Sequence, residues 1–257
     1  MPRPVRRDVF EPARGGSDNR METAIAARIE KLPWARLEES LWQFGYSRTT
    51  RLLTARQCAE LVELYPRRER FRSRIEMERF RFGAGDYQYF AEPLPEAVQA
   101  LRTAAYSHLA PIANRWMEAL GLPERYPAEL AELAAACRRL GQTKPTPLLL
   151  HYEAGGYNCL HQDLYGDLAF PFQMVCFLSR AGIDYTGGEL LLVEQRPRAQ
   201  SVGEAVAADQ GEAVIFTTRY RPVRGARGFY RGQMRHGVSR IRSGTRYTLG
   251  VIFHDAR

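Results

Sequence analysis

The stretch HYEAGGYNCLHQDLYGD, residues 151–167, carries the most informative pattern in this chain. Within it, His161 and Asp163 are two residues apart, and a third candidate ligand, His236, follows late in the sequence. Two imidazoles and one carboxylate form the facial triad that binds a non-haem Fe(II) and leaves coordination positions open. On a β-strand, a spacing of two puts both side chains on one face. The pattern therefore predicts an iron site built on β-strands.

The H-x-D pattern also occurs by chance, and Asp167 offers a second carboxylate close by. We prefer Asp163 because the H-x-D spacing places its carboxylate beside the imidazole of His161. A dedicated structural zinc site would use four closed ligands, usually with thiolates, so the proposed donor set favours iron.

Three further features favour a functional site over a chance pattern. Arg246 lies ten residues after His236 (246 minus 236), and its guanidinium could bind the carboxylate of a cosubstrate through two nitrogens. Tyr152 could offer its phenol to the same carboxylate. Gly187 and Gly188 open a strand between the ligand segments and would allow a close approach of the backbone.

The composition is that of a globular protein. Of the 257 residues, 45% are hydrophobic and 26% are charged, and no apolar run approaches the length of a membrane span. The basic first residues lack the apolar stretch of a secretory signal, so we expect a cytoplasmic protein. The four cysteines are far apart, which favours buried free thiols. The net charge of +8 comes almost wholly from arginine and makes a polyanionic partner plausible.

The chain divides into a helical part and a later part rich in strands. Residues 1–20 read as a flexible basic arm, residues 21–145 as a helical supporting region with a short β segment, and residues 146–257 as a catalytic core integrated with that region. Apolar spacing predicts helices at 23–32, 34–44, 55–64, 96–120 and 128–140. Strands are predicted at 72–82, 87–90, 147–152, 172–179, 189–194, 212–217, 234–241 and 246–254. This order indicates an α+β fold with an antiparallel barrel or sandwich.

The segment 147–254 resembles the Fe(II)- and 2-oxoglutarate-dependent dioxygenases, whose core is a double-stranded β-helix of the jelly-roll or cupin type. The resemblance is carried by Tyr152, Gly155, Gly156, the H-x-D pair, GGEL (187–190), GEAVIF (211–216) and HGVSRIRSGTRYTLGVIF (236–253). GGEL and SGTRYTL are similar to the prolyl-hydroxylase branch. The length and the helical front half resemble a bacterial family predicted to act oxidatively on alkylated bases in nucleic acid.

The resemblance implies a role for each residue of the site. His161, Asp163 and His236 would bind Fe(II), and Arg246, helped by Tyr152, would bind the distal carboxylate of 2-oxoglutarate. The implied reaction uses O2, converts 2-oxoglutarate to succinate and CO2, and hydroxylates a substrate carbon. On an N-methyl group, the hydroxylated product would collapse to formaldehyde and the free base.

The stretch 217–236 is the candidate for substrate binding, and it does not read as a strand. No Asp or Glu occurs between Ala213 and His254. Arginines for phosphates and aromatic rings for stacking are typical of single-stranded or flipped-base binding, which favours a nucleic-acid partner. The candidate substrate residues are Arg219, Tyr220, Arg221, Arg224, Arg227, Tyr230 and Arg231, with Phe229 and Arg235 among them.

Other interpretations stay open at this point. The stretch could be a solvated loop whose arginines pair with acids elsewhere, such as those in 129–132, or with a peptide substrate. Alkylation-repair enzymes of the AlkB type carry an Asn and a second Arg where this chain has Leu150 and Ile252. The alternatives are therefore a protein (prolyl-type) or small-molecule hydroxylase on the same scaffold, and a non-catalytic nucleic-acid binding protein.

Overall fold

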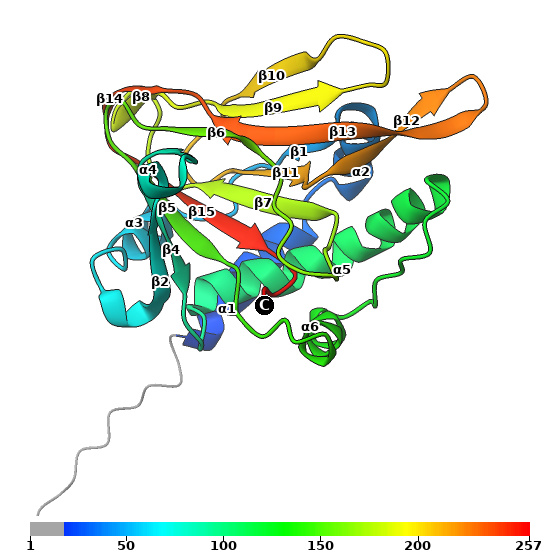
Figure 1. Cartoon of the computed structure of the whole chain (residues 1–257). Helices are drawn as coiled ribbons and strands as arrows, with labels where there is room; N and C mark the ends of the chain where they lie inside the picture. Colours follow the sequence, from blue (N-terminus) through cyan, green and yellow to red (C-terminus); the bar gives the residue numbers. More distant parts are fainter. Residues whose placement is uncertain (1–17) are drawn as a thin grey trace, which may run out of the picture.

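A computed structural model describes residues 18–257 (Figure 1). The flexible arm expected at residues 1–20 lies outside the described residues, apart from the backbone of its last three, which begins the first helix. The helices are α1 (Asp18–Glu30), α2 (Trp34–Phe44), α3 (Ala55–Val62), α4 (Met77–Phe80), α5 (Glu96–Ala119) and α6 (Leu130–Arg139), with a 3-10 turn at Arg68–Arg70. All five expected helices are confirmed, with shifted ends.

Fifteen strands make up the β structure of the described residues. The strands are β1 (Tyr46–Arg48), β2 (Phe71–Glu76), β3 (Gly83–Ala84), β4 (Asp86–Phe90), β5 (Leu148–Tyr152), β6 (Tyr157–His161), β7 (Phe172–Phe177), β8 (Tyr185–Gly187), β9 (Leu190–Gln195), β10 (Val202–Val206), β11 (Ala213–Thr217), β12 (Tyr220–Gly225), β13 (Gly228–Val238), β14 (Ile241–Gly244) and β15 (Arg246–Ile252).

Two antiparallel sheets face each other, as Figure 1 shows. The seven-stranded sheet has the order β1-β11-β7-β15-β5-β4-β2. The six-stranded sheet has the order β10-β9-β13-β6-β3, and its sixth strand, β12, pairs with β13. Strands β8 and β14 form a separate pair. This is the α+β arrangement that the order of the elements predicts, and its core is the double-stranded β-helix that the family resemblance implies.

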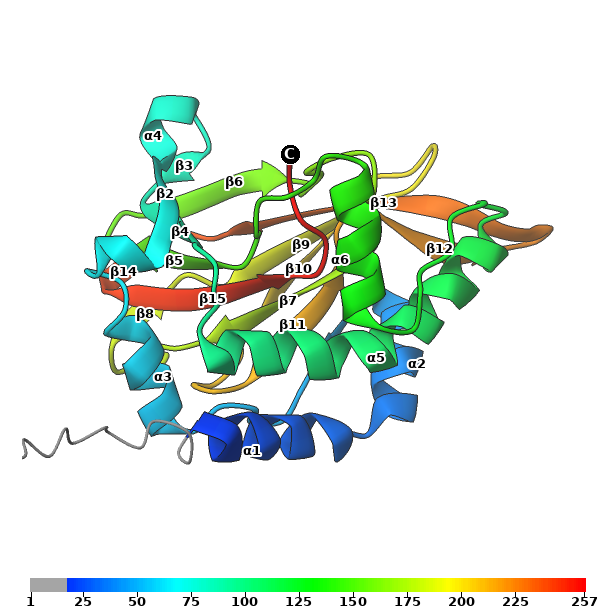
Figure 2. The same cartoon turned by 90° about the horizontal axis from the view of Figure 1, so that it is seen from below.

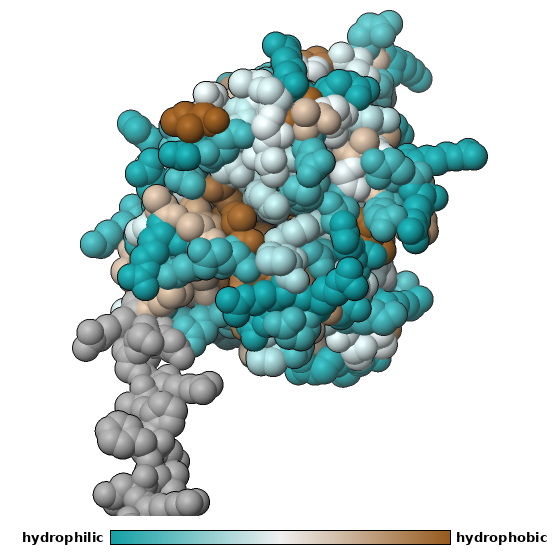
Figure 3. Space-filling model, turned by 90° about the vertical axis from the view of Figure 1, so that its left-hand side faces the viewer, coloured by the Kyte–Doolittle hydropathy of each residue, from teal (hydrophilic) through white to brown (hydrophobic). Residues whose placement is uncertain are grey.

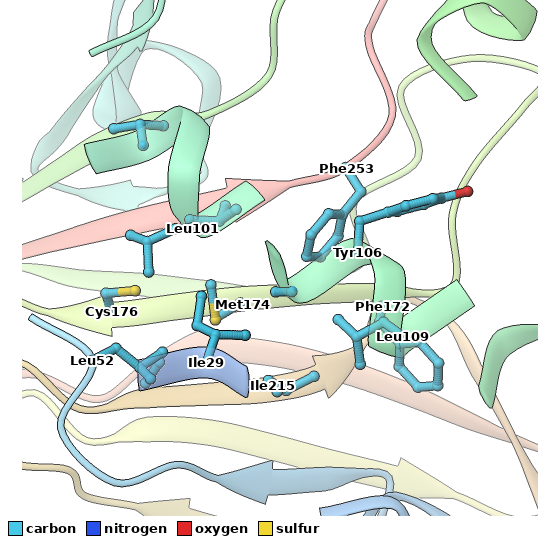
Figure 4. Packing of buried hydrophobic residues seen from close by; sticks show 14 of the residues in the cluster. Ile29, Leu52, Leu101, Tyr106, Leu109, Phe172, Met174, Cys176, Ile215 and Phe253 are labelled. Carbon is cyan, nitrogen blue, oxygen red and sulfur yellow. The ribbon is translucent and has the colours of Figure 1, made fainter. Parts of the chain in front are cut away.

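Helices α1 and α5 lie side by side against the outer face of the seven-stranded sheet (Figure 2). Ile29 of α1 and Leu101 of α5 are fully buried and pack with Met174 of β7 and Ile215 of β11 (Figure 4). This cluster joins the helical region to the strand-rich region in one hydrophobic core.

Strand β7 is buried along its whole length because both of its faces are covered. Met174 and Cys176 point toward the helices, whereas Val175 and Phe177 point toward the six-stranded sheet. The alternation of side chains along a strand explains this division. Gln173 shares a face with Val175 and Phe177, and so points into the space between the two sheets.

Two expectations for local structure are wrong. Residues 72–82 do not form one strand, because β2 ends at Glu76 and the short helix α4 follows. The stretch 217–236 is not a loop, because β12 and β13 pair as an antiparallel hairpin from Tyr220 opposite Gln233 to Gly225 opposite Gly228. Gly225 and Gly228 flank a two-residue turn. Exposed and buried positions alternate along β13, but the many arginines of the stretch make this strand pattern hard to recognise in the sequence.

Among residues 18–257, none of the helices combines the length and apolar character that a membrane crossing requires. The face of the molecule seen in Figure 3 is mostly hydrophilic, and its hydrophobic residues are confined to small areas.

Candidate metal centre

His161 and His236 lie directly opposite each other in the pairing of β6 with β13. Their ring centroids are 4.2 Å apart. Strand β6 ends at His161, so Asp163 comes just after the strand rather than on it. Its carboxylate nevertheless lies between the imidazoles, 3.1 Å from Nε2 of His236 and 3.4 Å from Nε2 of His161. One donor atom from each residue lies within 4.8 Å of the others, so the three expected ligands are brought together.

The electrostatics of the cluster favour a charged carboxylate on Asp163 and a neutral imidazole on His236. Burial opposes ionisation of Asp163, but the two histidines outweigh it and hold the pKa of Asp163 well below its usual range. Burial and the nearby His161 lower the pKa of His236. A charged carboxylate and a neutral imidazole are the forms that bind a metal ion.

Neighbouring groups fix the orientation of the candidate ligands. Nδ1 of His161 lies 2.8 Å from the carbonyl oxygen of Cys159, which can accept a hydrogen bond from Nδ1–H and so leave the lone pair of Nε2 free for a metal ion. The hydroxyl of Tyr165 donates to Asp163 at 2.7 Å. The side-chain amide of Gln173 lies 3.1 Å from Nε2 of His236. Sequence reasoning missed Tyr165 and Gln173, because only the fold brings them to the ligands.

The donor set fits Fe(II). Two imidazoles and one carboxylate, with no thiolate among them, form an incomplete ligand set that leaves room for exogenous ligands. The three residues line a cavity of about 410 Å³ between the two sheets. That volume lies within the usual range for small-molecule sites. The site can therefore hold a metal ion together with a small organic ligand.

Arg246 is a buried cation that faces the same cavity. Its side chain is 1% exposed, and its closest polar contact is 3.5 Å, to the hydroxyl of Thr248. Within the described residues it forms no ion pair, and its Nε has no hydrogen-bond partner. A buried guanidinium without an anion is costly, so this position is suited to an anionic ligand.

The surroundings of Arg246 agree with that interpretation. Tyr152 is fully buried, lies opposite Arg246 in the pairing of β5 with β15, and its ring centre is 5.6 Å from the guanidinium carbon. Gly188 has a φ of +69°, and a Cβ there would come within 2.9 Å of Cδ of Arg246. The expected close approach of the GGEL backbone is therefore confirmed.

The other histidines and Asp167 have structural partners. His151 points away from the cavity, with Nδ1 2.9 Å from Asp86 and its ring stacked on Tyr247. Asp167 pairs with Arg257 rather than with the cluster. His254 is fully buried, and its Nδ1 accepts from the backbone N–H of Phe170. His108 stacks on Trp34.

The candidate substrate residues on the hairpin are not equivalent. None of residues 219–235 lines the cavity. Contrary to the prediction, Arg221 is not exposed for contact with a substrate. Its side chain is buried, pairs with Glu194 at 2.9 Å and donates to the carbonyl of Trp42, so it is held inside the structure. Six of the remaining candidates are exposed, namely Arg219, Arg224, Arg227, Phe229, Arg231 and Arg235.

Two of the exposed arginines, Arg219 and Arg231, lie close to the ring of Tyr220. The guanidinium carbons of Arg219 and Arg231 lie 4.5 and 5.7 Å from the centre of the Tyr220 ring. Tyr230 is half-buried near the tip of the hairpin, and Phe229 packs on Trp42.

The expectation of buried thiols holds for three cysteines and is wrong for Cys159, which is exposed and lines the cavity. Further lining residues that sequence reasoning missed are Arg81, Phe82, Leu160 and Leu164. Their sequence signals, isolated apolar or basic residues near a turn, are not specific.

Comparison with known proteins identifies a family. Residues 85–256 match the family Oxygenase-NA, described as "Oxygenase, catalysing oxidative methylation of damaged DNA". Two proteins of Mycobacterium tuberculosis, Uncharacterized protein MT2286 (strain CDC 1551 / Oshkosh) and Uncharacterized protein Rv2227 (strain ATCC 25618 / H37Rv), are each 52% identical over 167 residues. These matches cover 65% of this chain and 72% of each relative.

Solved structures share the fold. A Pseudomonas putida prolyl-4-hydroxylase is 19% identical with a TM-score of 0.52, covering 87% of this chain and 99% of that one. An oxidoreductase of the 2OG-Fe(II) oxygenase family from Burkholderia pseudomallei is 14% identical with a TM-score of 0.51, covering 87% and 92%. At these identities the likeness shows the double-stranded β-helix fold. The chain therefore belongs to the Oxygenase-NA family, and it shares the fold of a solved oxidoreductase of the 2OG-Fe(II) oxygenase family.

Proposed function

We propose that His161, Asp163 and His236 hold the iron, that Arg246 with Tyr152 binds the distal carboxylate of 2-oxoglutarate, and that the substrate is an alkylated base in nucleic acid. The observation that carries the cosubstrate assignment is the buried guanidinium of Arg246. It lines the same cavity as the triad and forms no ion pair within 4.0 Å among the described residues.

Bound Fe(II), with 2-oxoglutarate and O2, would supply the oxidant that hydroxylates a substrate carbon while 2-oxoglutarate leaves as succinate and CO2. The residues of this chain bind and orient. Arg246 would form two parallel charge-assisted hydrogen bonds to the distal carboxylate, and the phenol of Tyr152 would donate a third. The two sheets would enclose the cosubstrate in the cavity between them and limit the access of water to the reacting atoms.

Oxidation of an N-methyl group would remove it. Hydroxylation at the methyl carbon gives an N-hydroxymethyl base, and its N–C bond breaks as the hydroxyl proton passes to the ring nitrogen. The products are formaldehyde and the repaired base, and no further reductant is required.

Three observations support a nucleic-acid substrate. The description of the family refers to damaged DNA. The chain has a net charge of +8. The exposed arginines of the β12–β13 hairpin stand in a segment without acidic residues, from Ala213 to His254, and could contact phosphates.

The test is succinate formation with Fe(II), 2-oxoglutarate and each of two substrate sets, methylated single-stranded oligonucleotides and a peptide library. We expect oligonucleotides to stimulate turnover, with formaldehyde released in proportion to succinate. His161→Ala should abolish both products. Stimulation by peptides alone would assign the chain to protein hydroxylation. If 2-oxoglutarate is not consumed with any substrate, the result would favour a non-catalytic nucleic-acid binding protein.

A metal titration tests the ligand assignment separately. Co(II) in place of Fe(II) should bind with one equivalent per chain, and its visible absorption should be lost in His236→Ala. Equal binding by the variant would show that the metal sits elsewhere.

A further inference from the structure

Exposed hydrophobic side chains gather at one side of the cavity mouth. Nine large hydrophobic residues of the described chain are exposed, and four of them lie on α4, on the turn between α4 and β3, and on the segment around His161. Phe80 is 53% exposed, Phe82 46%, Leu160 41% and Leu164 44%, and the last three line the cavity. Such a concentration at a cavity mouth is typical of a ligand-contacting surface.

The two phenylalanines form a flat stack. The rings of Phe80 and Phe82 are 5.5 Å apart between centroids, with an angle of 20° between their planes. Phe82 contacts the cavity directly, so the outer ring extends this flat apolar surface away from the mouth. A planar, exposed aromatic surface is suited to stacking by an unpaired base.

Backbone bonds hold this stack at the metal site. The N–H of Cys159 donates to the carbonyl of Phe82 at 2.8 Å, and the N–H of Phe82 donates to the carbonyl of Met77. Gly83 lies opposite Asn158 of β6, and a Cβ there would come within 2.2 Å of the carbonyl oxygen of Tyr157. The backbone of the turn that carries the two rings is thus attached to the strand that carries His161.

A free cation accompanies the rings. Arg81 lines the cavity mouth and, within the described residues, forms no ion pair. Its neighbour Arg79 is bound to Glu76 at 2.6 Å, and Glu78 accepts from the N–H of Gly85, so the nearby acids are engaged. Arg81 can therefore bind a phosphate next to a stacked base.

A second cluster of cationic and aromatic side chains, which contains Arg219 and Tyr220, lies near Gln162, the residue after His161. Gln162 lines the cavity and donates to the carbonyls of Met234 and Arg219. This places the base of the hairpin, with Arg219 and Tyr220, beside Gln162. From Asn158 to Gln162 an extended chain covers on the order of 13 Å, a span that a few nucleotides of a single strand can bridge.

We propose that Phe80 and Phe82 form a stacking platform for a base that neighbours the target base, and that Arg81 binds the adjoining phosphate. The chain would therefore recognise single-stranded nucleic acid lying across the mouth from the Arg81 side to the Arg219 side. This inference rests on the proposed nucleic-acid function and names the surface that selects the substrate.

The test compares Phe80→Ala, Phe82→Ala and Phe82→Trp with the wild type. A matched control is Phe44→Ala, since Phe44 is 44% exposed and does not line the cavity. The readouts are fluorescence anisotropy with a labelled single-stranded oligonucleotide, KM and kcat for the methylated oligonucleotide, and Tm. Loss of a base stack should weaken binding and raise KM by roughly 5- to 100-fold. Phe82→Trp should keep the affinity and KM close to the wild-type values because it retains a stacking ring. Phe44→Ala should match the wild type.

Arg81→Gln should lower affinity for every oligonucleotide sequence and reduce the slope of log affinity against log salt by about one. Unchanged affinity and KM in both alanine variants, in an enzyme that oligonucleotides stimulate, would overturn the platform and leave the proposed function intact. If no oligonucleotide stimulates or binds the wild type, the proposed function itself fails. A loss of affinity matched by Phe44→Ala or by a fall in Tm would also overturn the platform, because it would show a general effect on folding.

Discussion

Arg246 lies opposite Tyr152 in the pairing of β15 with β5, and its guanidinium carbon is 5.6 Å from the centre of the Tyr152 ring. Both side chains are completely buried, yet neither meets a carboxylate within the described residues. Two strands of one sheet thus hold a cation and a phenol beside the metal ligands. The arrangement supports the proposal that Arg246, with Tyr152, binds the distal carboxylate of 2-oxoglutarate.

Replacement of Arg246 by Leu should raise the KM for 2-oxoglutarate by roughly 10- to 100-fold, because charge-assisted hydrogen bonds are worth about 1.5 to 3 kcal/mol. Steady-state succinate formation checks this. Arg240→Leu is the matched control, since Arg240 is exposed and donates to the carbonyl of Gly155. If KM changes only in the control, Arg240 binds the cosubstrate.

Removal of the hydroxyl of Tyr165 should weaken metal binding. That hydroxyl donates to Asp163 at 2.7 Å and holds the carboxylate between the histidines. Partners of metal ligands typically contribute about 10- to 100-fold in affinity. Titration of Tyr165→Phe with Co(II), followed by visible absorption, should show a loss of at least several-fold. Wild-type affinity would mean that the backbone alone positions Asp163.

Replacement of Arg221 by Ala should destabilise the fold, because Glu194 loses its buried partner and keeps only the partly exposed Arg196, and the carbonyl of Trp42 loses its donor. The expected loss is about 2 kcal/mol of unfolding free energy, measured by denaturant titration. Arg224→Ala is the control on the same strand, and its exposed position predicts a change within about 0.5 kcal/mol. Equal stabilities would show that Arg221 is free to contact substrate.

Protonation of His254 should contribute to unfolding in mild acid. Burial lowers the pKa of His254 to about 4, against 6.5 for the free side chain. Between these values the unfolded chain binds a proton that the folded chain lacks, so stability falls as pH decreases through this window and is unaffected above it. The difference corresponds to about 3 kcal/mol. His254→Gln should remove this part of the pH dependence, as denaturation at pH 7 and pH 4.5 can show.

The amino-acid sequence was enough to predict the chemistry of the site and most of the secondary structure. The H-x-D spacing, the late His236 and Arg246 are residue types whose chemistry does not depend on the rest of the fold. Apolar periodicity located the five long helices and the core strands, because each of these buries one continuous face or both.

The tertiary structure alone decided which groups meet. The pairing of His161 with His236, the contact of Tyr165 with Asp163 and the attachment of Phe82 to β6 join segments whose order along the chain says nothing about their distance. It also divided the arginines of one hairpin into a buried partner of Glu194 and a set of exposed cations. Strand register and packing depend on all the long-range contacts together, and a local pattern of residue types does not contain them.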